Sequence, residues 1–429
     1  MQKNTFNAKE QEEKRKLFPY KWELIVILWV AYFLNQGDRQ IFNVVIPLIK
    51  ADLMLDDVQI GLVATLFTLV YGILVPVAGF AGDLFRRKWI IFFSLLIFSI
   101  GTLFTGFASG VVLLIVLRSI TTGGGEAFYY PAATSLIGQF HKKTRAMAMS
   151  IHQTSLYVGI VASGFIAGYI GENFGWQMAF LSFGLVGILW AFVVLWRVKD
   201  TPMPKDELNE NGEKPSFIEI VKAVFSRKTV YFLSLAFGCM CFVNVGYLTW
   251  MPTYLHEKFN MSLSAAGLHS TLYHFLFAFF GVMLGARISD RLALKRRRIR
   301  MEIEIIGLLL GAPFIYWMGI ADSKLWCYVA MGLFGVFRGI YDSNLFAALF
   351  DVIEPRYRSS SMGIMLAFAF IVGALAPVIL GKIKTVANME TGIMFLAGFY
   401  LLGAVLIFIG LKFFFNKNYY EENLITQNS

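Results

Sequence analysis

The stretch Asn35–Arg39 reads NQGDR and places an acid and a base inside an apolar segment, Trp22–Ile46, that is long enough to cross a lipid bilayer. An ionised side chain at the centre of a membrane helix costs about 2.5–3.5 kcal/mol, so it is kept where it meets a water-filled cavity or other polar groups. Because neighbouring helix residues point about 100° apart, Asp38 and Arg39 cannot satisfy each other alone. We interpret the pair as a functional site. The alternative is a neutralised pair that only packs one helix against another.

A second acid, Glu126, follows three glycines in another apolar segment, 111–140. Glu126 lies 14 residues before Phe140, and Asp38 lies 16 residues after Trp22. At 1.5 Å per residue these separations are about 21 and 24 Å, so the two acids are expected at similar depth in the membrane. The alternative for Glu126 is a hydrogen-bonded residue that holds two helices together.

Further polar side chains in apolar segments are candidates for contacting a solute. Arg338 and Asp342 are four residues apart and can pair along one face of a helix, in a structural or a functional role. The alternative for His152 is a packing residue. The candidate substrate-binding residues are Arg39, Tyr129, Tyr130, His152, Gln153, Asn244, Tyr247, Arg338, Asp342 and Asn344.

The composition is that of an integral membrane protein. Of the 429 residues, 57% are hydrophobic and 15% are charged, whereas soluble proteins carry about 25% charged residues. The apolar segments predict an all-α membrane protein with twelve transmembrane helices. They lie near residues 22–46, 58–81, 89–108, 111–140, 146–170, 177–197, 229–252, 264–289, 300–319, 325–350, 360–382 and 391–415.

The basic residues predict the orientation of these helices. The net charge is +10, but most of the 38 Lys and Arg fall in every second connection and in the terminal segments, which is the pattern of cytoplasmic segments and not of a nucleic-acid surface. We therefore expect both termini in the cytoplasm. The lysines expected on the outer side are Lys50, Lys258, Lys324, Lys382 and Lys384.

The same pattern predicts the division of the chain. We expect a cytoplasmic segment at 1–21, a six-helix half at 22–197, a cytoplasmic linker at 198–228, a second six-helix half at 229–415 and a cytoplasmic tail at 416–429. Within the linker, Ser216–Glu219 is a capping-box pattern that opens an amphipathic stretch ending at Phe225. The polar segment 1–21 precedes a full-length span and does not read as a cleavable signal peptide.

The connection after the second predicted helix carries a specific pattern. Gly79, Asp83, Arg87 and Lys88 resemble the signature loop between helices two and three of the major facilitator superfamily, although Leu84 and Arg86 depart from it. A degenerate copy with Gly285 and Asp290 appears in the second half, as expected for a parallel repeat. The resemblance implies a conformational gate. We expect Asp83 to meet the start of the eleventh helix at 359–361. The gate residues are Gly79, Asp83, Arg87, Lys88 and Asp290.

Within that superfamily, the chain resembles the anion:cation symporters, which carry sugar acids, and the spinster-like lipid transporters. The shared residues are Asn35, Asp38 and Arg39 in the first helix, and Glu126 after its glycines in the fourth. The resemblance implies proton coupling by Asp38 and Glu126 and substrate binding by Arg39. Arg118 lies one residue further from the glycines than is usual, so we expect it to point to another face.

These observations favour a secondary transporter that couples protons to a small organic anion such as a sugar acid. A lysolipid or amphipathic-lipid exporter is the first alternative, and a receptor or intramembrane enzyme is the second. We expect no enzyme activity, because no nucleophile–base spacing or metal-ligand cluster is evident. We also expect no cofactor, no metal and no nucleic-acid partner. The protein is predicted to be a monomer in a bacterial inner membrane, and the direction of transport is left open.

Overall fold

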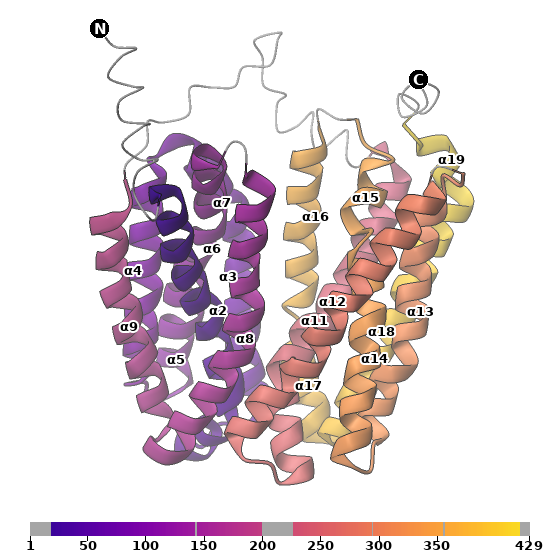
Figure 1. Ribbon diagram of the computed structural model, residues 1–429. Coiled ribbons are helices and arrows are strands. Elements are labelled where there is room, and N and C mark those ends of the chain that lie inside the picture. Colours follow the sequence, from indigo (N-terminus) through magenta and orange to yellow (C-terminus); the bar gives the residue numbers. More distant parts are fainter. Residues whose placement is uncertain (1–18, 142–143, 200–225, 294, 355–356, 421–429) are drawn as a thin grey trace, which may run out of the picture.

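The computed structural model describes residues 19–141, 144–199, 226–293, 295–354 and 357–420, which form helices joined by short turns, with no β-strand among them. Two consecutive bundles make up the molecule, as Figure 1 shows. The first bundle, called the first half, runs from indigo to magenta, and the second half runs from pink to yellow. The predicted amphipathic stretch at 216–225 lies outside the described residues.

The first half crosses the membrane in six helical segments. The fourth is subdivided into α5, a π-helix η1, α6 and α7. The elements are α2 (Tyr20–Asp52), α3 (Asp57–Leu84), α4 (Arg87–Thr105), α5 (Val111–Leu114), η1 (Ile115–Thr122), α6 (Gly123–Ala127), α7 (Tyr129–Phe140), α8 (Arg145–Phe174) and α9 (Trp176–Arg197).

The second half repeats this arrangement with six further segments, of which the last three are subdivided. Its final segment runs to Asn418, beyond the expected end at residue 415, and Asn418 accepts a 3.1 Å hydrogen bond from the Thr229 backbone N–H. The elements are α11 (Lys228–Phe259), α12 (Leu263–Ala293), α13 (Ile299–Ile320), α14 (Lys324–Asp342), α15 (Leu345–Phe350), α16 (Arg358–Gly373), α17 (Ala376–Val386), α18 (Met389–Ile409), η3 (Gly410–Phe414) and α19 (Phe415–Asn418).

Ten of the described helical segments are long and apolar enough to span a membrane by themselves. The two predicted spans outside that set are α2 and the segment formed by α14 and α15. The first of these carries Asp38 and Arg39, and the second carries Arg338 and Asp342. Both helices therefore carry charged side chains within the membrane. Each of these side chains must find polar partners inside the bundle.

Local sequence signals set the turns between the helices. Asp56 accepts a 2.7 Å bond from the Gln59 N–H, and the Gln59 side chain accepts a 3.0 Å bond from the Asp56 N–H, which is a capping box at the start of α3. Asn388 caps α18 in a similar way through Thr391. Between α8 and α9, Gly175 has φ = 90°, a backbone conformation that side chains other than glycine rarely adopt.

The two halves are joined closely at one end, which we call the closed end and which is at the bottom of Figure 1. There, Glu172 accepts a 2.5 Å hydrogen bond from the Leu263 N–H, and Lys384 lies 3.3 Å from the Asp57 carboxylate. Helices α8 and α12 approach so closely that a Cβ atom on Gly164 would lie 2.7 Å from the Gly267 carbonyl oxygen.

The opposite end, where α9 ends and α11 begins, is called the linker end. Near it, a Cβ atom added to Gly79 or to Gly363 would meet no atom within 4 Å, whereas one added to Gly164, Gly168 or Gly381 would collide with the backbone of the opposite half. Among the described residues, the closest glycine contacts between the two halves therefore lie at the closed end.

Replacing Gly164 by Ala tests the glycine contact. The added methyl group would collide with the backbone of α12, so the halves could not close at this end. We expect transport by Gly164→Ala to fall several-fold. Gly398→Ala is the matched control, because a Cβ at Gly398 meets no atom within 4 Å. Normal transport by Gly164→Ala would show that this close approach is not required.

Candidate functional site

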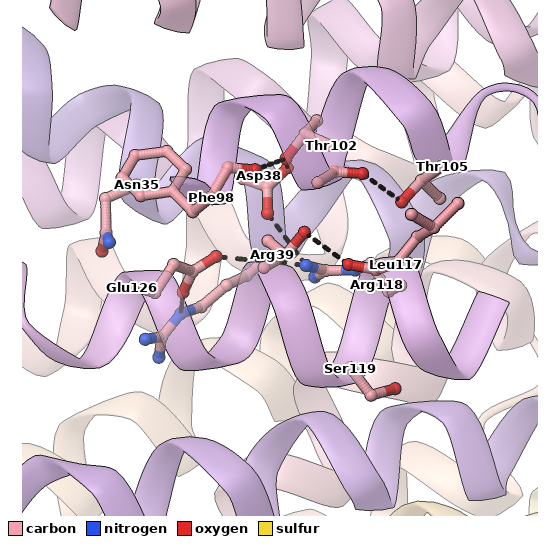
Figure 2. A network of polar contacts seen from close by, with 12 residues as sticks. Asn35, Asp38, Arg39, Phe98, Thr102, Thr105, Leu117, Arg118, Ser119 and Glu126 are labelled. Carbon is pink, nitrogen blue, oxygen red and sulfur yellow. Dashed lines mark hydrogen bonds and ion pairs between the residues drawn. The ribbon is translucent and has the colours of Figure 1, made fainter. Parts of the chain in front are cut away.

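Four charged residues of the first half form one buried network, shown in Figure 2. Asp38 accepts hydrogen bonds from the Thr102 hydroxyl and from Nη1 of Arg118, the latter at 2.8 Å. Arg39 donates from Nε to Glu126 at 2.5 Å. Nη1 of Arg118 also lies 4.0 Å from the second oxygen of Glu126, so the two acid–base pairs are linked.

The prediction that Arg118 points to another face is wrong. Arg118 lies within the π-helix η1, in which each turn holds about one residue more than an α-helical turn. This wider turn absorbs the extra residue between Arg118 and Gly123. The Thr121 and Thr122 hydroxyls bond to carbonyls five residues earlier, at 2.9 and 3.0 Å. The result is that Arg118 faces Asp38 and Glu126.

Aromatic rings support both arginines. The guanidinium of Arg118 lies 4.2 Å from the centre of the Phe67 ring, and that of Arg39 lies 4.1 Å from the centre of the Tyr71 ring. These distances are within the range of cation–π interactions. The two arginines differ in exposure, since the Arg118 side chain is 3% exposed and the Arg39 side chain is 25% exposed. Arg39 is therefore the more accessible of the two to a solute.

Three polar atoms of the network lack a hydrogen-bond partner among the described residues, Nη2 of Arg39, Nε of Arg118 and Oε1 of Glu126. A buried guanidinium N–H without a partner is unfavourable, so an incoming acceptor would gain by binding there. A carboxylate oxygen without a donor is a place where a proton can bind. The network thus offers both an anion contact and a proton acceptor.

Disruption of the Asp38–Arg118 pair should destabilise the protein. Both side chains are 3% exposed, and removing one partner of a buried ion pair costs about 3–5 kcal/mol because the other charge is left uncompensated. We expect Arg118→Gln to lower the unfolding temperature in detergent markedly. The double variant Arg118→Gln/Asp38→Asn should recover most of that loss. Additive losses in the double variant would show that the pair is not coupled.

A cavity of about 380 Å³ lies between the two halves, and Arg39 lines it. Amides and aromatic rings of the first half line it, together with residues of α11, α12, α14 and α16 from the second half. Its charged residues are Arg39, Arg118 and Arg338. Such a cavity holds a small organic solute and meets it with positive charge from both halves.

The second half has its own network around Arg338. Arg338 donates to the side-chain oxygen of Asn244 and to Nε2 of His274, the latter at 2.9 Å, and its Nε lies 3.3 Å from Asp342. A guanidinium has only donors, so Nε2 of His274 accepts and the ring is neutral with its proton on Nδ1. The predicted pairing of Arg338 with Asp342 is present, and Arg338 reaches the cavity.

The predicted substrate-binding residues divide into two groups. Arg39, Tyr130, Asn244 and Arg338 line the cavity. The predicted proton-coupling residues Asp38 and Glu126 lie behind it, at 2% and 1% exposure. The predicted substrate-binding residue Asp342 reaches it only through Arg338. Gln153 is half-buried on α8 and does not line the cavity.

The structure places Tyr129, His152, Tyr247 and Asn344 away from the cavity, because each is buried and bonded to neighbouring helices. Tyr129 donates to the Leu28 carbonyl at 2.6 Å, so His152, 3.2 Å away, must donate to the Tyr129 oxygen. Tyr247 donates to the Ser270 carbonyl at 2.7 Å, and Asn344 accepts from Ser289 at 2.5 Å. The burial of His152 and its bond to Tyr129 agree with the alternative given for it, a packing residue.

Several lining residues escaped the sequence analysis. Gln36, Gln40 and Asn43 lie along α2 at intervals of four and three residues around Arg39, and this helical spacing is a signal that could have found them. Tyr71 and Thr249 carry no comparable signal, because single polar or aromatic residues are common in membrane helices.

The predicted gate residues lie at the linker end. Arg87 is 6% exposed and Lys88 is half-buried at the start of α4, while Asp290 is exposed near the end of α12. The side chains of Asp83, Ser359 and Ser360 are outside what the structure describes, so the expected contact between Asp83 and α16 stays a prediction.

Two six-helix halves with a charged cavity between them define the class of secondary transporters. The chain belongs to the Major Facilitator Superfamily, whose family model matches residues 28–377. The sequence-based assignment to this superfamily is therefore confirmed.

Relatives of this chain include transporters of organic anions. It is 26% identical to the hexuronate transporter of Bacillus subtilis over 394 residues, covering 88% of this chain and 91% of the relative. It is also 26% identical to the probable galactarate/D-glucarate transporter of the same organism, with 91% of each chain covered.

Among solved structures, a bacterial homologue of the human lysosomal transporter Spinster, inward-facing and unoccupied, matches with a TM-score of 0.82. That match has 21% identity and covers 94% of this chain and 99% of the other. At this level of identity the similarity establishes the shared fold.

Proposed function

We propose that this protein is a proton-coupled symporter of a small organic anion such as a sugar acid, working by alternating access. The observation that carries the proposal is Arg39, which lines the cavity, keeps one guanidinium nitrogen without a partner and shares another with Glu126. The names of the two Bacillus subtilis relatives, which refer to sugar acids, support the substrate class.

The geometry of Arg39 supports anion binding. Its side chain is 25% exposed and lines the cavity, and a guanidinium can hold a substrate carboxylate through two parallel hydrogen bonds. Arg338 approaches from the second half and lines the same cavity. An anionic solute therefore contacts both halves at once, which is what alternating access around a central site requires.

The position of Glu126 supports the proposed proton coupling. When Glu126 is ionised, it competes with the substrate carboxylate for the charge of Arg39, 2.5 Å away. When it is protonated, that competition ends and Arg39 attracts the anion more strongly. Proton binding and anion binding thus favour each other, and linkage makes this coupling reciprocal. Asp38 takes part through Arg118, which lies near both acids.

Lipid export is less well supported. Apolar and aromatic side chains form much of the cavity lining and would suit a lipid chain. Three arginines and the amides of Gln36, Gln40, Asn43 and Asn244 also line it, and these suit a small polar anion better. The similarity to the Spinster homologue concerns the fold and does not extend to a substrate.

The basic residues support the orientation within this proposal. The linker end would face the cytoplasm, with both termini on that side, since most Lys and Arg lie there. The protein would act as a monomer in a bacterial inner membrane. In this orientation the closed end lies outside.

Uptake into proteoliposomes tests the function. Purified protein is reconstituted into vesicles, and a pH gradient, acidic outside, is imposed. Uptake is then measured for a panel of sugar acids, neutral sugars and lysolipids. We expect at least one sugar acid to accumulate only with the gradient, and neutral sugars and lysolipids not to. Gradient-independent movement of lysolipids would favour the exporter, and a neutral sugar as the only substrate would contradict the role of Arg39.

A further inference from the structure

A second cavity, of about 620 Å³, opens on the membrane-facing side of the first half and is separate from the central cavity. Its walls come from α3 and α4, and its floor comes from η1 and α6. Five large apolar side chains around it are 42–61% exposed. We call it the lateral groove. Those five are Phe85, Trp89, Phe93, Ile97 and Ile120.

The lateral groove is chemically apolar. Its hydroxyl groups are those of Ser94 and Thr121, and both are bonded to backbone carbonyls, Ser94 to Gly125 at 2.7 Å and Thr121 to Val116 at 2.9 Å. Gly124 and Gly125 leave the floor without side chains, which gives the groove its depth. Apart from the indole N–H of Trp89 at one end, the lining offers few hydrogen-bonding groups, so it suits a hydrocarbon chain.

The length of the groove matches one membrane leaflet. Its lining runs from Leu74 to Phe85 along α3, a distance of about 16 Å at 1.5 Å per residue. Half of a bilayer's hydrocarbon core is about 15 Å thick. Trp89 lies near the linker end of the groove, where an aromatic side chain meets the head-group region.

Basic residues stand at the same end. Arg86 is exposed and Lys88 is half-buried, immediately beyond Phe85 at the mouth of the groove. The lateral groove is apolar, as long as one leaflet is deep, and has positive charge at its mouth. These features are complementary to an acyl chain that ends in a negatively charged head group. Zwitterionic lipids match the channel but not the charge at its mouth.

We propose that the lateral groove is a binding site for one anionic phospholipid of the linker-end leaflet. An acyl chain lies against Gly124 and Gly125, and the phosphate head group meets Arg86 and Lys88. The floor of the groove directly precedes Glu126 in the chain, so the bound lipid packs behind the helix that carries this acid. The inference is independent of the proposed substrate and coupling.

Quenching of Trp89 fluorescence tests the site in the intact protein. The chain has nine tryptophans, so the Trp89 signal is taken as the difference between the natural protein and Trp89→Phe. Vesicles contain increasing fractions of phosphatidylglycerol or phosphatidylcholine with brominated chains. We expect half-maximal quenching of Trp89 at a several-fold lower fraction of the anionic lipid.

Two variants refine the measurement. Lys88→Gln should remove most of the preference for phosphatidylglycerol, whereas the matched control Lys412→Gln, an exposed lysine in the last helical segment, should keep it. Gly124→Leu fills the floor and should weaken quenching by both lipids. Equal quenching of the natural protein by the two lipids would overturn the proposal, since the groove would then be an ordinary lipid-facing surface. Absence of quenching by either lipid would overturn it as well, because protein would cover the groove.

Discussion

Replacing Arg39 by Lys should weaken the apparent affinity for the transported anion by about 10- to 100-fold. Lysine keeps the positive charge but loses the planar fork that binds Glu126 through Nε and leaves Nη2 for a solute. A hydrogen bond to a charged group contributes about 1.5–3 kcal/mol, and about 1.4 kcal/mol corresponds to a factor of ten in affinity. The measurement is the concentration dependence of uptake into proteoliposomes.

The matched control for this substitution is Arg197→Lys. Arg197 also pairs with a glutamate, Glu23, but its side chain is 60% exposed and lies far from the cavity lining. Surface ion pairs contribute little to stability, so this variant should transport with unchanged affinity. If Arg39→Lys also kept the natural affinity, Arg39 would be a structural residue.

Replacing Glu126 by Gln should abolish accumulation against a gradient while exchange of labelled substrate across the membrane continues. Gln keeps the shape of the side chain but cannot bind or release a proton. Each coupled proton contributes about tenfold accumulation per unit of pH gradient, and this factor should be lost. The exchange assay, with substrate on both sides and no gradient, shows that the variant still binds and moves substrate.

Asp38→Asn should have the same effect on accumulation, but it also leaves Arg118 buried without its carboxylate, so lower stability is expected. Glu126→Gln is therefore the sharper test. Glu304→Gln serves as its control, because Glu304 is a fully buried acid of the second half that does not line the cavity. Accumulation that survives Glu126→Gln and Asp38→Asn together would exclude this pair as the proton site.

The features that the sequence predicted best are those that depend on the composition of long segments. Twelve apolar segments give the helices, and the charges of Asp38, Arg39 and Glu126 stand out because ionised groups are rare in membrane helices. Counting residues along each helix predicted that the two acids lie at similar depth, and in the structure Arg118 lies near both of them. Because neighbouring helix residues point about 100° apart, Asp38 and Arg39 do not pair with each other. Asp38 binds Arg118 and Arg39 binds Glu126, both in the fourth segment.

The orientation of Arg118 could not be predicted in this way. Residue counting assumes α-helical turns, and the π-helix from Ile115 to Thr122 changes the rotation of every residue before it. The sequence could predict only some of the polar residues that line the cavity. Tyr129 and Tyr130 are adjacent in sequence, yet the first is buried against Leu28 and the second lines the cavity, because helix packing decides which face meets the solute.

The most direct test of the central claim is to measure proton movement when substrate is added. Proteoliposomes with a pH indicator inside, and with no initial gradient, receive a sugar acid that the protein transports. The account predicts that the interior becomes more acidic as the anion enters, and that Glu126→Gln abolishes this change while exchange persists. Uptake of the anion without any change in internal pH would contradict proton coupling.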